Sequence, residues 1–209
     1  EISAWVDQVM ARVPSSPQPG PECIRQAELT ILRQINDLLV YVIDPSIYDS
    51  LPGLTWESDE LRALTDFRGK TVIDIGAGTG RLAFVATEQA EAVFAVEPVA
   101  NLRYYLKEKA RQRGIHNLYP VDGLITDLPF PAAFADVTMG GHVFGDCPGA
   151  EYAEMARVTR PGGMLILCPG TSLAEEKAHT FLVEQGFDWA VFEEPEDGPK
   201  QKYWKTLPG

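Results

Sequence analysis

The sequence has few cysteines, and this shortage excludes two classes of protein. The three cysteines, Cys23, Cys147 and Cys168, are odd in number and form no C-x-x-C pair. Neither a disulfide-stapled secreted domain nor a cysteine zinc site is therefore expected. A reducing, cytoplasmic setting is the simplest expectation for such a chain.

Positive charge is also scarce. Lysine and arginine together number 18 against 30 aspartates and glutamates, which gives a formal net charge of −12. A surface field of this sign repels a phosphate backbone, so a nucleic-acid partner is not expected and a small-molecule substrate is favoured.

Long apolar runs are missing, so no membrane span is predicted. The first residues show no basic-then-apolar signal segment. Because the chain begins at Glu1 and not at a methionine, we expect that some residues precede it. The sequence also lacks a G-x-S-x-G hydrolase turn, a phosphate-binding G-K-[ST] loop and any cluster with metal-ligand spacing, so no metal is expected.

A short apolar strand followed by three glycines stands out against this background. Residues 71–75 read TVIDI, which is typical of a strand buried inside a parallel sheet. Gly76, Gly78 and Gly80 let the backbone turn sharply, so that a ligand can lie against N–H groups at the start of the next helix. A dinucleotide-binding loop reads G-x-G-x-x-G, whereas Arg81 occupies the third glycine position here.

Two acids indicate what this loop binds. Asp74 precedes the first glycine by two residues, where a carboxylate would repel a pyrophosphate but pair with the ammonium group of an amino-acid tail. A second buried-strand run, Ala92–Val96, ends at Glu97. An acid at the tip of the second strand can accept hydrogen bonds from both ribose hydroxyls. Together the two acids favour a nucleoside that carries an amino acid.

Further motifs follow in a fixed order. They are Val121-Asp-Gly123, Asp127-Leu-Pro-Phe-Pro131, Phe134–Met139 and Glu154–Gly163. With the D-I-G-A-G-T-G loop and Glu97, these motifs resemble the class I S-adenosylmethionine-dependent methyltransferases, and within them the subgroup called methyltransferase type 11. The resemblance covers residues 70 to 169, about half of the chain.

The resemblance implies S-adenosylmethionine as the cofactor and S-adenosylhomocysteine as its product. Asp74 and the glycine loop would hold the methionyl part, Glu97 the ribose, and Asp122 with Gly123 the edge of the adenine. The implied cofactor-binding residues are Asp74, Gly76, Ala77, Gly78, Gly80, Glu97, Pro98, Asp122, Gly123 and Gly140. The alternative for the loop is a merely structural strand-to-helix turn, and for Asp122 it is an N-cap or turn aspartate.

The fourth predicted strand covers residues 135–139, and residues 140–148 follow it. The family places cofactor and acceptor contacts in this segment. His142 is the one group of this segment that titrates near neutral pH, so it is the candidate catalytic residue that would take a proton from the acceptor. The alternative is that His142 only packs or hydrogen-bonds beside the cofactor, because alignment of the reactants supplies much of such catalysis. Asp146 is a weaker candidate.

Strands that alternate with helices predict an α/β fold with a doubly wound, mostly parallel sheet. The resemblance implies a Rossmann-like sheet of seven strands with an antiparallel last strand. Residues 1–66 are predicted to form an N-terminal helical extension with helices over 2–13 and 22–43 and a Pro-rich linker at 14–21. A further helix is predicted to start at Ser58 and to stop at Gly69, and residues 160–163 are predicted to form a tight turn before the fifth strand, residues 164–168. The methyltransferase domain would then span 67–209, and the N-terminal helices would offer a homodimer contact.

The predicted function is methyl transfer from S-adenosylmethionine to a small-molecule acceptor that the sequence does not identify. Two alternatives stay open. A non-catalytic S-adenosylmethionine-binding or scaffold protein would use the N-terminal helices to bind a partner. An NAD-dependent oxidoreductase would share the strand, the glycine loop and the acid, but the loop spacing and Asp74 disfavour it.

Overall fold

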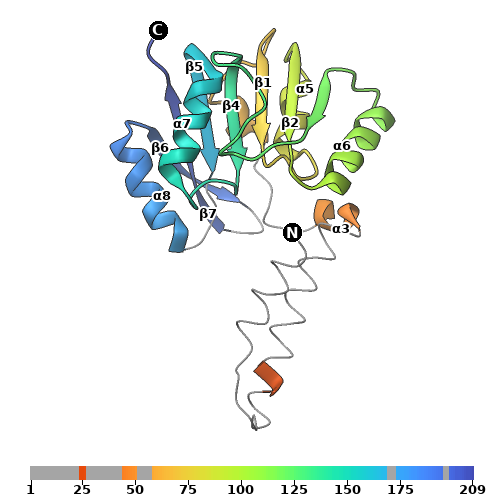
Figure 1. Cartoon of the computed structure of the whole chain (residues 1–209), viewed down its shortest axis with the longest axis horizontal. Coiled ribbons are helices and arrows are strands. Elements are labelled where there is room, and N and C mark those ends of the chain that lie inside the picture. Colours follow the sequence, from red (N-terminus) through yellow and green to blue (C-terminus); the bar gives the residue numbers. More distant parts are fainter. Residues whose placement is uncertain (1–23, 27–43, 51–57, 169–172, 195–197) are drawn as a thin grey trace.

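The computed structural model of the chain describes residues 24–26, 44–50, 58–168, 173–194 and 198–209. These residues form a seven-stranded sheet with helices packed on both of its faces (Figure 1). None of the helices in the described ranges has the length and the apolar character that a membrane span requires.

The sheet has the predicted doubly wound order β3-β2-β1-β4-β5-β7-β6. The strands are β1 Thr71–Ile75, β2 Ala92–Val96, β3 Leu118–Val121, β4 Ala135–Gly141, β5 Thr159–Cys168, β6 Asp188–Glu194 and β7 Gly198–Thr206. Strands β1 to β5 are parallel, and β7 runs antiparallel between β5 and β6. The predicted fold class is thereby confirmed, and Pro120 lies on an edge strand, where its missing N–H costs no ladder hydrogen bond.

The helices are α3 Pro45–Ser50, α4 Ser58–Arg62, α5 Arg81–Thr87, α6 Ala100–Gln112, α7 Pro148–Val158 and α8 Leu173–Glu184. One core cluster joins α4, α5 and α6 to one face of the sheet, and a second cluster joins α7 and α8 to the other face. Alternate residues of β1 serve the two clusters, because successive side chains of a strand point to opposite faces. The central strand is therefore apolar on both sides, as the sequence predicts.

Two predicted boundaries differ in the structure. The helix expected to run from Ser58 to Gly69 ends at Arg62. Beyond it the carboxylate of Asp66 accepts a hydrogen bond from the Arg68 N–H at 3.0 Å, and such local side-chain bonds compete with helix formation. The turn predicted at residues 160–163 lies inside β5 as a bulge opposite Asp136, whose carboxylate pairs with Arg160.

The N-terminal extension falls mostly outside the described residues. Of the two predicted helices, only residues 24–26 are described, and they are helical. The linker at 14–21 and the proposed dimer contact are not described. The division at residue 66 also stays a prediction, although Leu61 is buried in the core cluster that holds α5.

Substitution of Gly80 is expected to destabilise the fold more than substitution of Gly114. Both glycines have positive φ, 88° and 66°, so alanine costs roughly 1–2 kcal/mol at either position. At Gly80 a Cβ would also lie 2.6 Å from Leu106 and 2.7 Å from Phe84, whereas nothing lies within 4 Å of a Cβ at Gly114. Overpacking adds about 1–3 kcal/mol.

Urea unfolding of Gly80→Ala and the matched control Gly114→Ala measures this difference. Equal losses of unfolding free energy in the two variants would show that the packing of Leu106 and Phe84 on Gly80 is not tight.

Candidate functional site

The carboxyl ends of β1 to β4 lie together along one edge of the sheet, because these four strands are parallel neighbours. The strand order reverses between β1 and β4, and open α/β sheets bind ligands at such a switch point. The segments that carry the predicted cofactor-binding residues follow these strand ends. They are the loop 76–80 after β1, Glu97-Pro98 after β2, Asp122-Gly123 after β3, and Gly140 at the end of β4.

The glycine loop adopts the backbone that its sequence predicts. Gly76, Gly78 and Gly80 have φ values of 63°, 54° and 88°. Residues other than glycine rarely adopt this backbone region. The loop is closed by two backbone hydrogen bonds, from Ala77 N–H to Val96 O at 3.0 Å and from Gly80 N–H to Ala77 O at 2.7 Å. The turn is thus rigidly connected to the end of β2.

Val143 packs against Gly76 of this loop and against Gly140 at the end of β4. A Cβ added to Gly76 would lie 2.8 Å from Val143 Cγ2, and one added to Gly140 would lie 2.7 Å from Val143 Cγ1. Both positions therefore require glycine for steric reasons as well as for φ at Gly76. The sequence argument did not single out Val143, because a lone valine in a loop carries no distinguishing pattern.

Asp74 is a buried acid at the end of β1, with 2% of its surface exposed. Its Oδ2 atom has no hydrogen-bond partner among the described residues. Burial raises the pKa of this carboxyl to about 8; the backbone N–H of Ala83 in the first turn of α5 opposes the shift, and the charge of Glu97 adds to it. A cation at Oδ2 would therefore stabilise the ionised form strongly.

Glu97 is also buried, and both of its carboxylate oxygens face backbone donors. Oε2 accepts a hydrogen bond from Gly78 N–H at 2.9 Å, and Oε1 accepts one from Val99 N–H at 2.9 Å. Burial nevertheless keeps the pKa of Glu97 above its ordinary value. Each oxygen of a carboxylate can accept about two hydrogen bonds, so Glu97 retains capacity for one hydroxyl on each oxygen.

Arg103 connects the ends of β2 and β3, a role that sequence reasoning missed. Its Nη1 atom donates to the backbone oxygen of Glu97 at 2.7 Å and to Asp122 Oδ1 at 3.0 Å. Asp122 is largely exposed, so this ion pair contributes little to stability. Its effect is to orient the Asp122 carboxylate beside Glu97.

His142 has a left-handed backbone, with φ of 58°, at the end of β4. Its N–H donates to the backbone oxygen of Cys168 at 2.7 Å, which ties the loop to the end of β5. A non-glycine residue in this region is uncommon, and such residues gather at functional sites. The structure therefore places the candidate catalytic residue at the predicted edge of the sheet.

The buried Glu151 of α7 shapes the rest of this loop. Its Oε2 accepts the Gly145 N–H and its Oε1 accepts the Cys147 N–H, both at 2.8 Å. Asp146, the weaker candidate, is exposed. Glu151 was not predicted as a site residue, although an acid in the first turn of a helix that starts at Pro148 is the available sequence signal.

The comparisons with known proteins agree with this geometry. Residues 73–167 match the family model described as a methyltransferase domain. A solved S-adenosylmethionine-dependent methyltransferase from Aquifex aeolicus superimposes with a TM-score of 0.63 at 19% identity, over 78% of this chain and 97% of that chain.

Residues 73–167 therefore form a methyltransferase domain.

Relatives of this methyltransferase domain carry two kinds of name. The demethylmenaquinone methyltransferase of Geobacillus stearothermophilus is 32% identical over 127 residues, which are 57% of this chain and 53% of the relative. An uncharacterized methyltransferase of Anoxybacillus flavithermus is 24% identical over 84% of this chain and 80% of its own length. The chain thus spans about half the length of the demethylmenaquinone relatives that it matches. The solved structure of the [4+2]-cyclase SpnF has the same fold, with a TM-score of 0.63 at 16% identity over 72% of this chain.

In the absence of ligand, Asp74→Asn is expected to stabilise the methyltransferase domain, and this stabilisation should grow as the pH rises. The pKa of Asp74 is raised to about 8 in the fold, against an ordinary value near 3.8. The stability that the protonated group contributes is therefore complete below about pH 4 and is lost as the pH rises through about 8. Asparagine does not ionise, so this loss should disappear.

Melting temperatures at pH 5, 6.5 and 8 measure the effect, since each 1 kcal/mol shifts the melting temperature by about 2–4 °C in a domain of this size. The advantage of Asp74→Asn over the wild type should grow with pH. The exposed Glu91→Gln is the control for removal of one negative charge. A gap that stays constant across this pH range would contradict the raised pKa.

Proposed function

We propose that the chain transfers the methyl group of S-adenosylmethionine to a small-molecule acceptor. The observation that carries this proposal is the meeting of two buried acids at one sheet edge, Asp74 with an oxygen that has no partner among the described residues and Glu97 with spare acceptor capacity. These groups suit an ammonium ion and a pair of hydroxyls, and the cofactor of this class carries both.

The proposed cofactor contacts are those predicted from the sequence. Asp74 would pair with the amino group, Glu97 would accept from the ribose hydroxyls, and Asp122 with Gly123 would face the adenine edge. The backbone of Gly76, Ala77, Gly78 and Gly80, together with Pro98 and Gly140, would line the cofactor. The ion pair with Arg103 supports the role of Asp122, because it holds the carboxylate at the end of β3.

When bound, S-adenosylmethionine supplies a sulfonium methyl group that is already electrophilic. The chain's own task is to align an acceptor and exclude water, which can contribute roughly 7–11 kcal/mol. We propose that His142 serves mainly to shape the loop beside the cofactor, since its backbone is left-handed and its N–H is bonded to the backbone oxygen of Cys168. A role as general base is the second possibility.

The acceptor is proposed to be a small molecule. The net charge of −12 disfavours a nucleic acid, and the relatives named demethylmenaquinone methyltransferase make a naphthoquinone-type compound the first acceptor to assay. Because SpnF shares the fold but is named a cyclase, the fold alone does not determine the reaction. A non-catalytic S-adenosylmethionine-binding protein is therefore the alternative to test.

Calorimetric titration of the wild type with S-adenosylhomocysteine is expected to give a dissociation constant on the order of micromolar. Glu97→Gln should weaken it by about tenfold, because hydrogen bonds to a charged acceptor contribute about 1.5–3 kcal/mol. NADH serves as the competing ligand in a parallel titration. Tighter binding of NADH than of S-adenosylhomocysteine would reverse the proposal.

Incubation with methyl-labelled S-adenosylmethionine and a metabolite extract separates an enzyme from a binding protein. We expect label to appear in a small-molecule product. Binding of S-adenosylhomocysteine without transfer of label to any acceptor, an added demethylated naphthoquinone included, would support the non-catalytic alternative.

His142→Asn distinguishes the two roles of this residue, because asparagine tolerates a left-handed backbone but does not titrate. We expect the rate to fall less than about tenfold and the pH–rate profile to keep its shape. A fall in the rate of about 10²–10⁴-fold, together with loss of the limb of the pH–rate profile near neutral pH, would instead assign His142 as the general base.

A further inference from the structure

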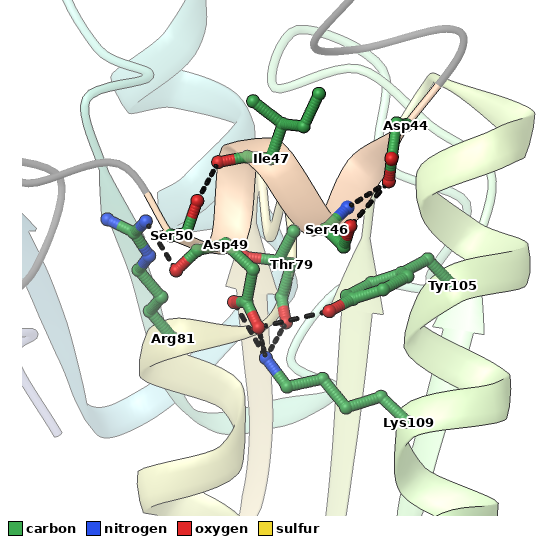
Figure 2. A network of polar contacts seen from close by, with 9 residues as sticks. All are labelled: Asp44, Ser46, Ile47, Asp49, Ser50, Thr79, Arg81, Tyr105 and Lys109. Carbon is green, nitrogen blue, oxygen red and sulfur yellow. Dashed lines mark hydrogen bonds and ion pairs between the residues drawn. The ribbon is translucent and has the colours of Figure 1, made fainter.

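Helix α3 is attached to the glycine loop through Asp49 (Figure 2). The Asp49 carboxylate accepts two hydrogen bonds of 2.7 Å from Lys109 Nζ and one of 3.1 Å from the hydroxyl of Tyr105. The same Lys109 ammonium group donates to the backbone oxygen of Thr79 at 3.1 Å. Asp49 and the glycine loop therefore share one cation.

A second contact joins α3 to the other side of Gly80. The backbone oxygen of Asp49 accepts a hydrogen bond from Arg81 Nη2 at 3.2 Å. Thr79 and Arg81 flank the glycine whose left-handed backbone starts α5. Both residues beside this turn are thus connected to Asp49, directly or through Lys109.

The Asp49–Lys109 pair is partly shielded from water, with 24% and 11% of the side chains exposed. Burial raises the pKa of Asp49, but the hydrogen bonds that its carboxylate accepts and the positive charge of Lys109 together outweigh burial, so the pKa lies below its ordinary value. The Asp49 carboxyl group is therefore ionised at neutral pH. Removal of one partner leaves the other charge partly buried, so the loss is greater than for an exposed pair.

We propose that Asp49 is a positioning residue of the cofactor site. With Lys109 it holds residues 79–81 at the end of the glycine loop, so that docking of α3 and binding of the cofactor stabilise each other. This inference rests on the proposed function, because it assumes that the glycine loop contacts the cofactor. Such a coupling is reciprocal and typically changes affinity by about 5- to 150-fold.

A more exposed ion pair at the far end of α5 provides the control. Arg62 of α4 pairs with Glu88, the C-cap of α5, at 2.8 Å. This pair also attaches a segment N-terminal of β1 to α5, but it contacts no residue of the glycine loop. Its removal reports what the loss of an attachment does to stability alone.

The test is calorimetric titration of Asp49→Asn and Glu88→Gln with S-adenosylhomocysteine, well below their melting temperatures. Asp49→Asn is expected to melt earlier than the wild type, and Glu88→Gln is expected to melt at most slightly earlier, because its ion pair is exposed. Asp49→Asn should bind about tenfold more weakly, whereas Glu88→Gln should keep the wild-type affinity. Hydrogen exchange of the amides of residues 76–80 should rise in Asp49→Asn only.

The outcomes separate this inference from the proposed function. If the wild type does not bind S-adenosylhomocysteine, the proposed function fails and the inference fails with it. If Asp49→Asn binds as tightly as the wild type, the positioning role is overturned while the proposed function stands. An equal loss of affinity in Glu88→Gln would also overturn it, because the effect would then follow general stability.

Two further variants keep the test decisive if Asp49→Asn does not fold. Lys109→Gln removes the shared cation, and Tyr105→Phe removes a single hydrogen bond and should weaken binding about twofold. In a double-mutant cycle, Asp49→Asn with Lys109→Gln should cost little more than the worse single variant, since the two side chains act as a unit. Full additivity would contradict the shared role.

Discussion

Burial of the Asp74 carboxyl group at the end of the central strand is the constraint on which the site depends. A buried carboxylate without a cationic partner is costly, and the raised pKa near 8 expresses that cost. The first turn of α5 offsets only part of it, through the backbone N–H of Ala83. The strand therefore ends in a buried acid that a cationic ligand would stabilise, and a turn with three glycines follows it.

Backbone N–H groups and the buried Glu151 hold the loops at the strand ends in place. Glu97 is oriented by N–H groups of Gly78 and Val99, and Glu151 fixes the loop after β4 through two N–H groups. Such second contacts keep the functional atoms within the small tolerance that catalysis requires. His142, whose φ is 58°, lies at the start of the same loop after β4.

The shared fold leaves the reaction open, because a cyclase and methyltransferases have the same sheet at low sequence identity. In this chain several side chains shape the edge of the sheet at which β1 to β4 end. Val143 lies over Gly76 and Gly140, Arg103 orients Asp122, and Asp49 attaches α3 to the loop.

The sequence by itself determined the strand and helix pattern, the three glycines and the acids Asp74 and Glu97. These follow from local chemistry, since a buried parallel strand must be apolar and a left-handed turn favours glycine. The end of helix α4 at Arg62 was harder to predict from the sequence, because local side-chain hydrogen bonds compete with the continuation of the helix. Only the tertiary structure decided the partners of Arg103, Glu151 and Asp49. Asp49 and Lys109 are 60 positions apart in the chain, so their pairing depends on how α3 and α6 pack and leaves no periodic signal in the sequence.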